Sequence, residues 1–313
     1  MMTVIWLLVL LIAATVTALV WFTWNTMRKV EAAVPPRGQF MDISTGRLHY
    51  VDKGQGPAIV MIHGLGAQLG NFDYALVDAL SATHRCIAID RPGMGWSDRP
   101  DDAPANPRAQ AGYVAEAIDA LGLERPLIVG HSLGGAIAVC LAQDFPEKAR
   151  GLALLAPLTR GGDAPSAAFA SLGIKSDLVR KALAWTLATP IGLRSTDMVF
   201  DLIFGPDPVP PDYSTKGGGL LGLRPVSFFN TSRDYMASLA DIKWMRAGYA
   251  DMPVPVAVLF GEDDRILSVE TQGRKLVADH PAIRLEVTQG GHMLPLTHPQ
   301  ACAEFIRRTD PGI

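Results

Sequence analysis

A serine placed between two glycines, directly after an apolar run, constrains the fold of this chain more than any other feature. The pentapeptide is Gly130-His131-Ser132-Leu133-Gly134, and it lies between the apolar run 127–129 and the small-residue stretch 136–139. This order predicts a strand, a sharp turn bearing Ser132, and a helix. Glycine on both sides allows the turn to approach neighbouring backbone closely. Ser132 would then lie at a helix N-terminus, where free N–H groups can stabilise an oxyanion.

Strands alternate with helices on both sides of this unit. Expected strands are 46–53, 58–62, 86–89, 127–129, 151–155, 255–260 and 283–287, and expected helices are 71–80, 106–121, 133–144, 268–278 and 299–308. Such alternation predicts an α/β protein with a mostly parallel central sheet and helices on both faces.

The alternation stops in residues 161–250, which contain Gly, Pro and short helical patches without a convincing strand. We interpret this segment as a helical cap inserted into the core. Most of its apolar side chains are expected to pack onto the core, and a few to line a hydrophobic substrate pocket. The predicted organisation is 1–30 as an N-terminal transmembrane anchor, 31–45 as a linker, 46–160 and 251–313 as the two parts of the core, and 161–250 as the cap.

The anchor prediction rests on residues 4–24, which contain no ionisable side chain. As a helix this run spans about 30 Å, the thickness of a bilayer core. A cleaved signal peptide is one alternative, but it favours a basic start and a shorter apolar run. A buried core helix is another, although it would have little to pack against. Membrane contact is therefore expected through residues 4–24.

Topology and pairing of this helix stay open. Arg28, Lys29 and Arg37 follow the span and favour a cytoplasmic catalytic domain. Three charges do not settle the orientation. Ala14 and Ala18 form a small-xxx-small pair that would allow two helices to associate as a homodimer.

Composition argues against several other classes of function. The net charge is −3 and there is no basic stripe, so no nucleic-acid partner is expected. The three cysteines, Cys86, Cys140 and Cys302, form no disulfide framework and are expected to be buried thiols. None has metal-ligand spacing to a histidine, so the sequence predicts neither a metal nor another cofactor.

A nucleophilic serine needs a base and an orienting acid, which follow it along the chain on this kind of fold. The candidate acids are Glu262, Asp263 and Asp264, just after an expected strand. Glu262 is interpreted as a solvated turn residue, which leaves the two aspartates. The candidate base is His292, because it alone among the seven histidines follows a strand in a glycine-rich loop after the acids.

An oxyanion hole needs two backbone N–H groups. We expect Leu133 to supply one and Leu65 the other, from the loop His63-Gly64-Leu65-Gly66 after the strand 58–62. A phosphate-binding loop is the alternative, but the lysine or the full G-x-G-x-x-G pattern that it requires is absent.

These segments resemble the α/β-hydrolase superfamily over about residues 40–310. The matching motifs are 63–66, Asp90-Arg91-Pro92-Gly93-Met94-Gly95-Trp96-Ser97, 130–134, Gly261-Glu262-Asp263-Asp264 and Gly291-His292. The resemblance implies that Asp264, three residues after Gly261, is the acid, with Asp263 as runner-up. A serine at the turn excludes, by the same resemblance, the dehalogenase and epoxide-hydrolase branches.

The apolar N-terminus, the segment 223–225 and the run 291–295 resemble membrane-anchored bacterial lipases and phospholipases, and monoacylglycerol lipases with an N-terminal anchor. This implies a single-pass protein of the bacterial inner membrane. Such proteins can face the periplasm, opposite to the side that the basic residues favour.

The sequence therefore predicts a membrane-anchored serine hydrolase of carboxylic esters, acting on acyl lipids through Ser132, His292 and Asp264. Alternatives on the same triad are a small-ester esterase, a thioesterase, a C–C bond hydrolase and a cofactor-free haloperoxidase. A non-catalytic binding protein is a further alternative. Acyl-chain length and head group are left undetermined.

Overall fold

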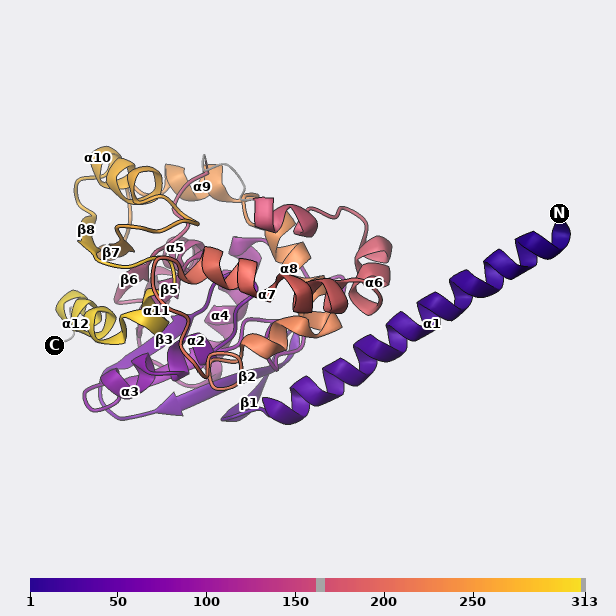
Figure 1. Cartoon of the computed structure of the whole chain (residues 1–313). Helices are drawn as coiled ribbons and strands as arrows, with labels where there is room; N and C mark the ends of the chain where they lie inside the picture. The colour runs from indigo at the N-terminus through magenta and orange to yellow at the C-terminus, as the bar shows by residue number, and fades with distance from the viewer. Residues whose placement is uncertain (162–166, 311–313) are drawn as a thin grey trace.

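The computed structural model describes residues 1–161 and 167–310, and its centre is an eight-stranded sheet (Figure 1). The strands are β1 (Gln39–Ile43), β2 (Gly46–Lys53), β3 (Ala58–Ile62), β4 (Arg85–Ile89), β5 (Leu127–His131), β6 (Gly151–Leu155), β7 (Val256–Gly261) and β8 (Arg284–Thr288). Their order is β1-β2-β4-β3-β5-β6-β7-β8. β1, β2 and β4 pair antiparallel, and all pairs from β4 to β8 are parallel.

Helices cover both faces of this sheet. One face packs against α4 (Pro107–Ala120), α5 (Leu133–Asp144), α9 (Ile242–Ala247) and α10 (Lys275–Asp279). The other packs against α2 (Gly70–Asp73), α3 (Leu76–Leu80), α11 (Leu294–Thr297) and α12 (Pro299–Thr309). Successive strand residues such as Ile128 and Val129 therefore enter different clusters, and both are fully buried. This explains why the central strands are continuous apolar runs.

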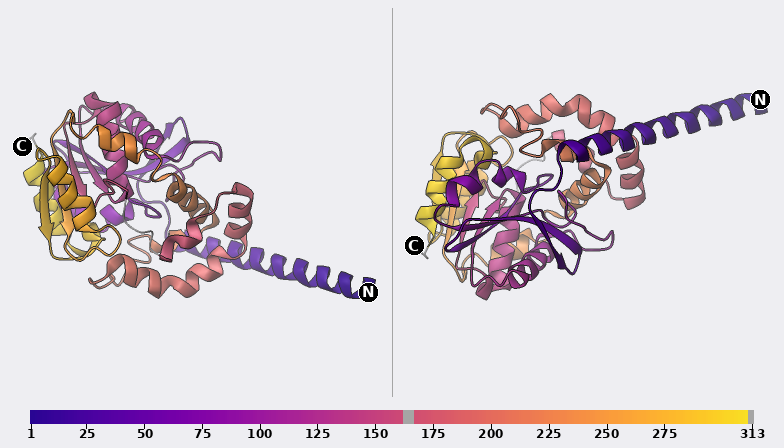
Figure 2. Two further views of the ribbon diagram at one scale, coloured as in Figure 1. Left: turned by 90° about the horizontal axis from the view of Figure 1, so that it is seen from above. Right: turned by 90° about the horizontal axis from the view of Figure 1, so that it is seen from below.

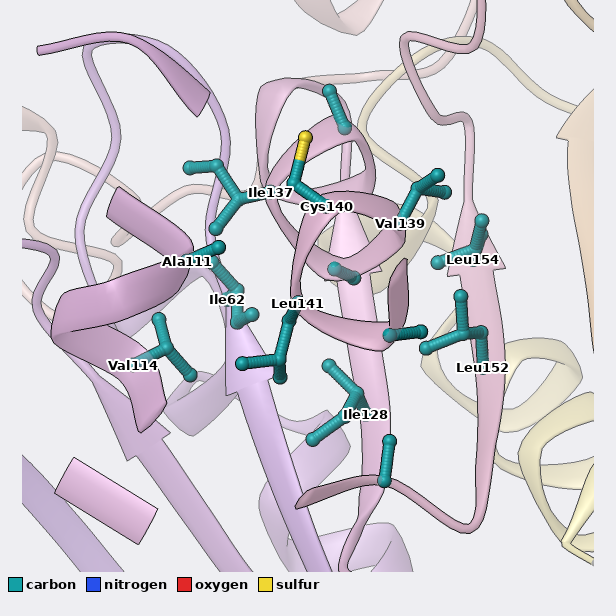
Figure 3. Close-up of a cluster of buried hydrophobic side chains, with 14 of the residues drawn as sticks. Ile62, Ala111, Val114, Ile128, Ile137, Val139, Cys140, Leu141, Leu152 and Leu154 are labelled. Carbon is teal, nitrogen blue, oxygen red and sulfur yellow. The ribbon is translucent and has the colours of Figure 1, made fainter. Parts of the chain in front are cut away.

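Helix α5, which follows Ser132, lies in the middle of one cluster (Figure 3). Its residues 133–142 are all buried, against α4 on one side and against Ile128, Leu152 and Leu154 of the sheet. A helix buried all round needs small side chains where neighbours come close, and α5 has Gly134, Gly135 and three alanines. The close packing fixes the helix N-terminus, and with it Ser132, relative to the sheet.

Between β6 and β7 the described residues contain helices and turns but no strand. They are η2 (Ala167–Leu172), α6 (Asp177–Trp185), α7 (Ala188–Phe204), η3 (Gly219–Leu223), α8 (Pro225–Ala237) and α9. The last helix, α9, packs into the core cluster through Ile242 and Met245. Residues 162–166 of the expected cap and 311–313 of the expected core lie outside the described residues. The proposed division of the chain into segments stays a prediction.

Helix α1 (Met2–Ala33) projects from the body of the molecule (Figures 1 and 2). Residues 2–18 are exposed throughout, whereas Thr23, Val30 and Val34 are buried. Val30 and Val34 pack with Leu221 of η3. By length and composition α1 could cross a membrane, and a signal sequence would pass the same test.

The structure differs most from the expected elements at three places. Residues 39–43, expected to be linker, form β1, an edge strand that pairs with β2. The expected helix 71–80 is two short helices, interrupted at Ala75 in a non-helical conformation (φ −155°, ψ −31°). The expected helix 268–278 begins as a π-helix, η4 (Val269–Arg274), where Thr159 Oγ1 donates to the Gln272 carbonyl at 2.7 Å. In each place tertiary contacts decide the local conformation.

Candidate active site

Ser132 lies at the turn between β5 and α5, as the pentapeptide predicts. Its backbone has φ +55° and ψ −121°, and residues other than glycine rarely adopt a positive φ. The residue is 8% exposed. A strained turn of this kind holds the hydroxyl at the C-terminal edge of the sheet, where open α/β sheets place their sites.

The two glycines that flank the turn are required by close contacts between backbones. A Cβ on Gly134 would lie 2.0 Å from the Ile62 carbonyl oxygen of β3, and one on Gly130 would lie 2.5 Å from the Gly134 carbonyl oxygen. Neither neighbour is a flexible side chain, so neither can move aside. The sequence pattern around Ser132 therefore has a steric cause.

Asp264 and His292 form a close pair. Asp264 Oδ2 lies 2.7 Å from His292 Nδ1, and the two side chains are 0% and 6% exposed. Asp264 Oδ1 accepts the N–H groups of Ile266 and Leu267 at 2.8 and 2.9 Å. Glu262 and Asp263 are exposed. The geometry thus favours Asp264 over Asp263 as the partner of His292.

Ser132 and His292 line one cavity of about 400 Å³. No hydrogen bond joins their side chains among the described residues, and such bonds often form only when substrate is bound. Apolar side chains dominate the rest of the cavity, among them Ile203, Met236, Leu239 and Leu267. Several come from the segment between β6 and β7, as expected for a cap over a pocket. A cavity of this size and character fits a largely apolar ligand.

Two backbone N–H groups, those of Leu65 and Leu133, are placed near Ser132. The loop after β3 touches the serine, since a Cβ on Gly64 would lie 2.8 Å from Ser132 Cβ. Leu65 and Leu133 both line the cavity. In residues 1–161 and 167–310, neither N–H donates to a protein acceptor. Unpaired backbone donors in the lining of the serine's cavity are what an oxyanion hole requires.

His131 holds the loop of His292 in place, a role that sequence reasoning missed. Its Nε2–H donates to the His292 carbonyl oxygen at 2.9 Å, and the two rings lie 5.0 Å apart. Burial, with the neighbouring His292, lowers the pKa of His131 to about 3. The ring is therefore neutral at ordinary pH. In the sequence, the position of His131 next to Ser132 was the only indication of this role.

The roles of three other residues near the site were also missed, although Arg91 lies in one of the matching motifs. Arg91 donates to the carbonyl oxygens of His63 and Gly64, and Asp234 of α8 contacts Arg91. Asp207, after α7, accepts the Gly291 N–H at 3.0 Å beside His292. Arg91 stands in a Gly- and Pro-containing loop after an apolar strand, which is a weak signal. The two aspartates have no local signal, because their partners are distant in sequence.

The three cysteines are free thiols. All three cysteines are buried, as expected, and burial raises the pKa of Cys86 to about 12. Within the described ranges, no group of three His, Cys, Asp or Glu side chains is arranged to hold a metal ion.

A family model described as the alpha/beta hydrolase family matches residues 59–305. Over 168 residues the chain is 35% identical to the dihydrolipoyllysine-residue acetyltransferase component of the acetoin cleaving system of Cupriavidus necator, covering 53% of this chain and 44% of that protein. It is 36% identical over 121 residues to haloalkane dehalogenase 2 of Mycobacterium bovis, covering 38% and 42%. The chain thus spans less than half the length of these curated relatives.

Among solved structures, the crystal structure of a membrane phospholipase A, described as a bacterial virulence factor, matches with a TM-score of 0.64. The match covers 99% of this chain and 98% of that one at 23% identity. At this identity the likeness shows a shared fold.

Proposed function

Because the chain belongs to the alpha/beta hydrolase family, we propose that it is a serine hydrolase that cleaves carboxylic esters of acyl lipids. One observation supports this above the others. His292, paired with Asp264 at 2.7 Å, lines the same apolar cavity as Ser132 at its strained turn. A nucleophile, a base and an orienting acid are then available in one place.

In this proposal His292 removes the proton of Ser132 as its oxygen attacks the ester carbonyl carbon. Asp264 holds the imidazole by Nδ1 and stabilises the imidazolium that forms. The N–H groups of Leu65 and Leu133 bind the oxyanion. His292 then gives its proton to the leaving alcohol, and water hydrolyses the acyl-enzyme by the reverse sequence of proton transfers.

Because the cavity is apolar, we infer that it binds the acyl chain of the substrate. Burial of each methylene in such a cavity contributes about 0.8 kcal/mol. Small-ester esterase, thioesterase and C–C hydrolase activities use the same residues, and substrate comparison separates them. The serine, rather than an aspartate, at the turn supports ester chemistry over dehalogenation.

The proposed location is a membrane, with α1 as a single-pass anchor. Residues 2–18 of α1 are exposed and apolar, and the last turns of the helix pack on the cap. An anchor docked in this way would hold the cavity near a supply of acyl chains. The resemblance to anchored bacterial lipases supports an inner-membrane location.

The test compares full-length protein in detergent with Ser132→Ala. Substrates are an acyl ester series of increasing chain length, a phospholipid and a monoacylglycerol. We expect lipid turnover that falls by about 10⁴-fold or more in Ser132→Ala, together with loss of fluorophosphonate labelling. Turnover of short esters alone would indicate an esterase. Turnover that survives in Ser132→Ala would refute the mechanism.

A further inference from the structure

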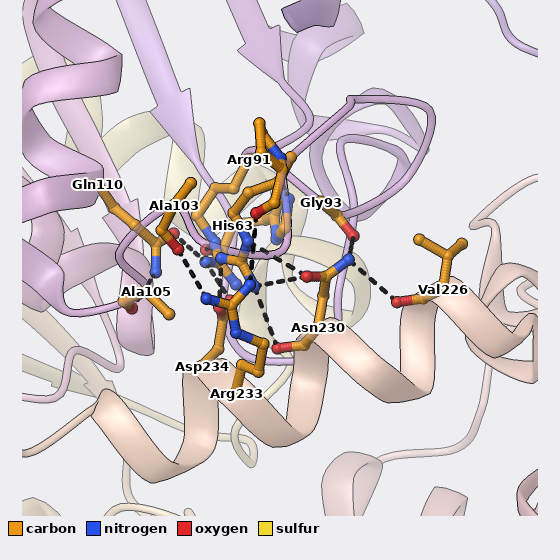
Figure 4. Close-up of polar contacts among 12 residues, drawn as sticks. His63, Arg91, Gly93, Ala103, Ala105, Gln110, Val226, Asn230, Arg233 and Asp234 are labelled. Atoms are coloured by element: carbon orange, nitrogen blue, oxygen red, sulfur yellow. Dashed lines mark hydrogen bonds and ion pairs between the residues drawn. The ribbon is translucent and has the colours of Figure 1, made fainter. Parts of the chain in front are cut away.

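A buried polar network connects the cap helix α8 with the loop that follows β3 (Figure 4). At its centre is Arg91, two residues after β4, which is 0% exposed. Its guanidinium donates to backbone oxygens of the loop and to a carboxylate of the cap. A fully buried guanidinium needs all of these partners, because an unpaired buried charge is strongly destabilising.

Arg91 contacts the loop at three points. Its Nε and Nη2 donate to the carbonyl oxygens of His63 and Gly64 at 3.0 and 2.8 Å, and its backbone N–H donates to His63 Nε2 at 2.9 Å. Since His63 Nε2 accepts, the proton is on Nδ1, which donates to the same Gly64 oxygen at 2.9 Å. Burial, together with the charge of Arg91, lowers the pKa of His63 well below its usual value and keeps the ring in this neutral form.

These contacts set the direction of the next N–H group. A trans peptide directs its C=O and the following N–H to opposite sides. With the Gly64 oxygen held by Arg91 and His63, the Leu65 N–H points away from these two residues, and Gly64, Leu65 and Ser132 all line the cavity. Gly64 has no side chain to restrict its backbone, so an unheld peptide could rotate its carbonyl toward the cavity. An oxygen there would repel an oxyanion.

The cap holds Arg91 in turn. Asp234 of α8 is 0% exposed, and its two oxygens accept from Arg91 Nη1 and Arg99 Nη1, each at 2.7 Å. One turn earlier, Asn230 accepts from Arg99 Nη2 at 2.7 Å and donates to the Gly93 carbonyl at 2.9 Å. The carboxylate that fixes α8 on the core is therefore the same one that fixes the guanidinium behind the Gly64 peptide.

We propose that Arg91 and Asp234 are positioning residues for the oxyanion hole, so that docking of the cap and orientation of the Leu65 N–H depend on one shared ion pair. This inference rests on the proposed ester hydrolysis. Arg91 acts on the Gly64 peptide directly, and Asp234 acts through Arg91. Neither residue lines the cavity or touches the substrate in this proposal.

Arg91→Lys tests the inference, with Arg99→Lys as the matched control. Lysine keeps the charge but lacks the planar fork that reaches two carbonyls and a carboxylate together. Arg99 shares Asp234, but its hydrogen bonds among the described residues reach only Asn230 and Asp234. A role in cap docking alone would therefore make the two variants alike.

The measurements are kcat and KM on a soluble acyl ester, Ki for a trifluoromethyl ketone with the same acyl chain, and Kd for its unreactive ether analogue. The ketone adds to Ser132 and forms an anion that needs the hole, whereas the ether does not. We expect Arg91→Lys to lower kcat and ketone affinity by about 10²–10³-fold, the usual effect of losing one oxyanion donor. KM and ether affinity should change by less than about threefold, and Arg99→Lys should leave kcat within about threefold of wild type.

Asp234→Asn keeps the inference testable if Arg91→Lys does not fold. It keeps the shape of the side chain, and kcat and ketone affinity should fall together without loss of ether affinity. Equal kcat values in Arg91→Lys and Arg99→Lys, or a fall in kcat with unchanged ketone affinity, would overturn the inference. Wild-type protein that neither cleaves esters nor reacts with a fluorophosphonate would overturn the proposed function itself, which is a separate outcome.

Discussion

At the scale of single residues, the candidate site depends on histidines in different surroundings. His292 reaches the cavity and is held by Asp264 through Nδ1 and, at its backbone, by His131. His131 is 2% exposed, and its Nδ1 has no hydrogen-bond partner among the described atoms. A histidine buried in this way is a structural group that must stay neutral.

The neutral state of His131 predicts a stability that depends on pH. Its folded pKa of about 3 is below the usual 6.5, so between these values the unfolded chain binds a proton that the folded chain does not. Above pH 6.5 the burial of neutral His131 makes its full contribution to the free energy of unfolding. As the pH falls below 6.5, the free energy of unfolding should decrease by up to about 1.4 kcal/mol per pH unit.

Urea denaturation at several pH values, compared with His131→Gln, measures this effect. The glutamine amide can still donate to the His292 carbonyl but does not titrate, so the dependence on pH should be shallower in the variant. The buried His63 contributes a remaining slope in both proteins. Identical slopes would show that His131 is not the group responsible.

At the scale of elements, the strand–turn–helix unit at Ser132 is fixed by backbone contacts as much as by apolar burial. Gly134 lies against β3, and α5 is buried along its length. Not every helical glycine has such a reason. Gly112, inside α4, has open space where a Cβ would be.

Alanine at these two positions should therefore have opposite effects. Gly134→Ala places a Cβ against the Ile62 carbonyl and should lower the free energy of unfolding by more than about 3 kcal/mol. Gly112→Ala should raise it by about 0.5–1 kcal/mol, because it removes backbone freedom from the unfolded chain without a clash. Chemical denaturation of both variants decides this, and a destabilised Gly112→Ala would contradict the contact analysis.

At the scale of the whole molecule, α1 has two parts with different surroundings. The part up to residue 18 is exposed, and the last turns pack on η3. There the buried Arg224 contacts Glu31 at 3.5 Å and stacks over Trp96. The second part thus belongs to the folded body. Only the exposed apolar residues of the first part lack contacts with the folded body that would cover them.

Two truncations separate these parts. Deletion of residues 2–18 should move the protein from the membrane fraction to the soluble fraction with little change in stability, since those residues make no buried contact. Deletion of residues 2–34 should also lower the free energy of unfolding by about 2–4 kcal/mol, because the packing of Val30 and Val34 is lost. Mass spectrometry of the mature N-terminus decides between an anchor and a cleaved signal sequence, which predicts a shortened chain.

The sequence by itself determined the features that depend on local pattern. The central strands are recognisable because a strand buried on both faces is an unbroken apolar run, and β3 and β6 have the predicted bounds. The turn at Ser132 is recognisable because its glycines are a steric requirement. The apolar composition of α1 is equally local. Each of these patterns is contained in one continuous stretch of the sequence, so it can be recognised without tertiary information.

Only the tertiary structure decided the features that depend on distant partners. β1 exists because it pairs with β2, and the break between α2 and α3 accompanies a contact of Tyr74 with Asp212. Asp263 and Asp264 are adjacent and chemically alike, and only the path of the chain shows which one meets His292. Arg91 and Asp234 are 143 residues apart, and folding alone makes them a pair. An interaction between distant residues has no local pattern, which is why sequence reasoning could place the candidate site but not the residues that support it.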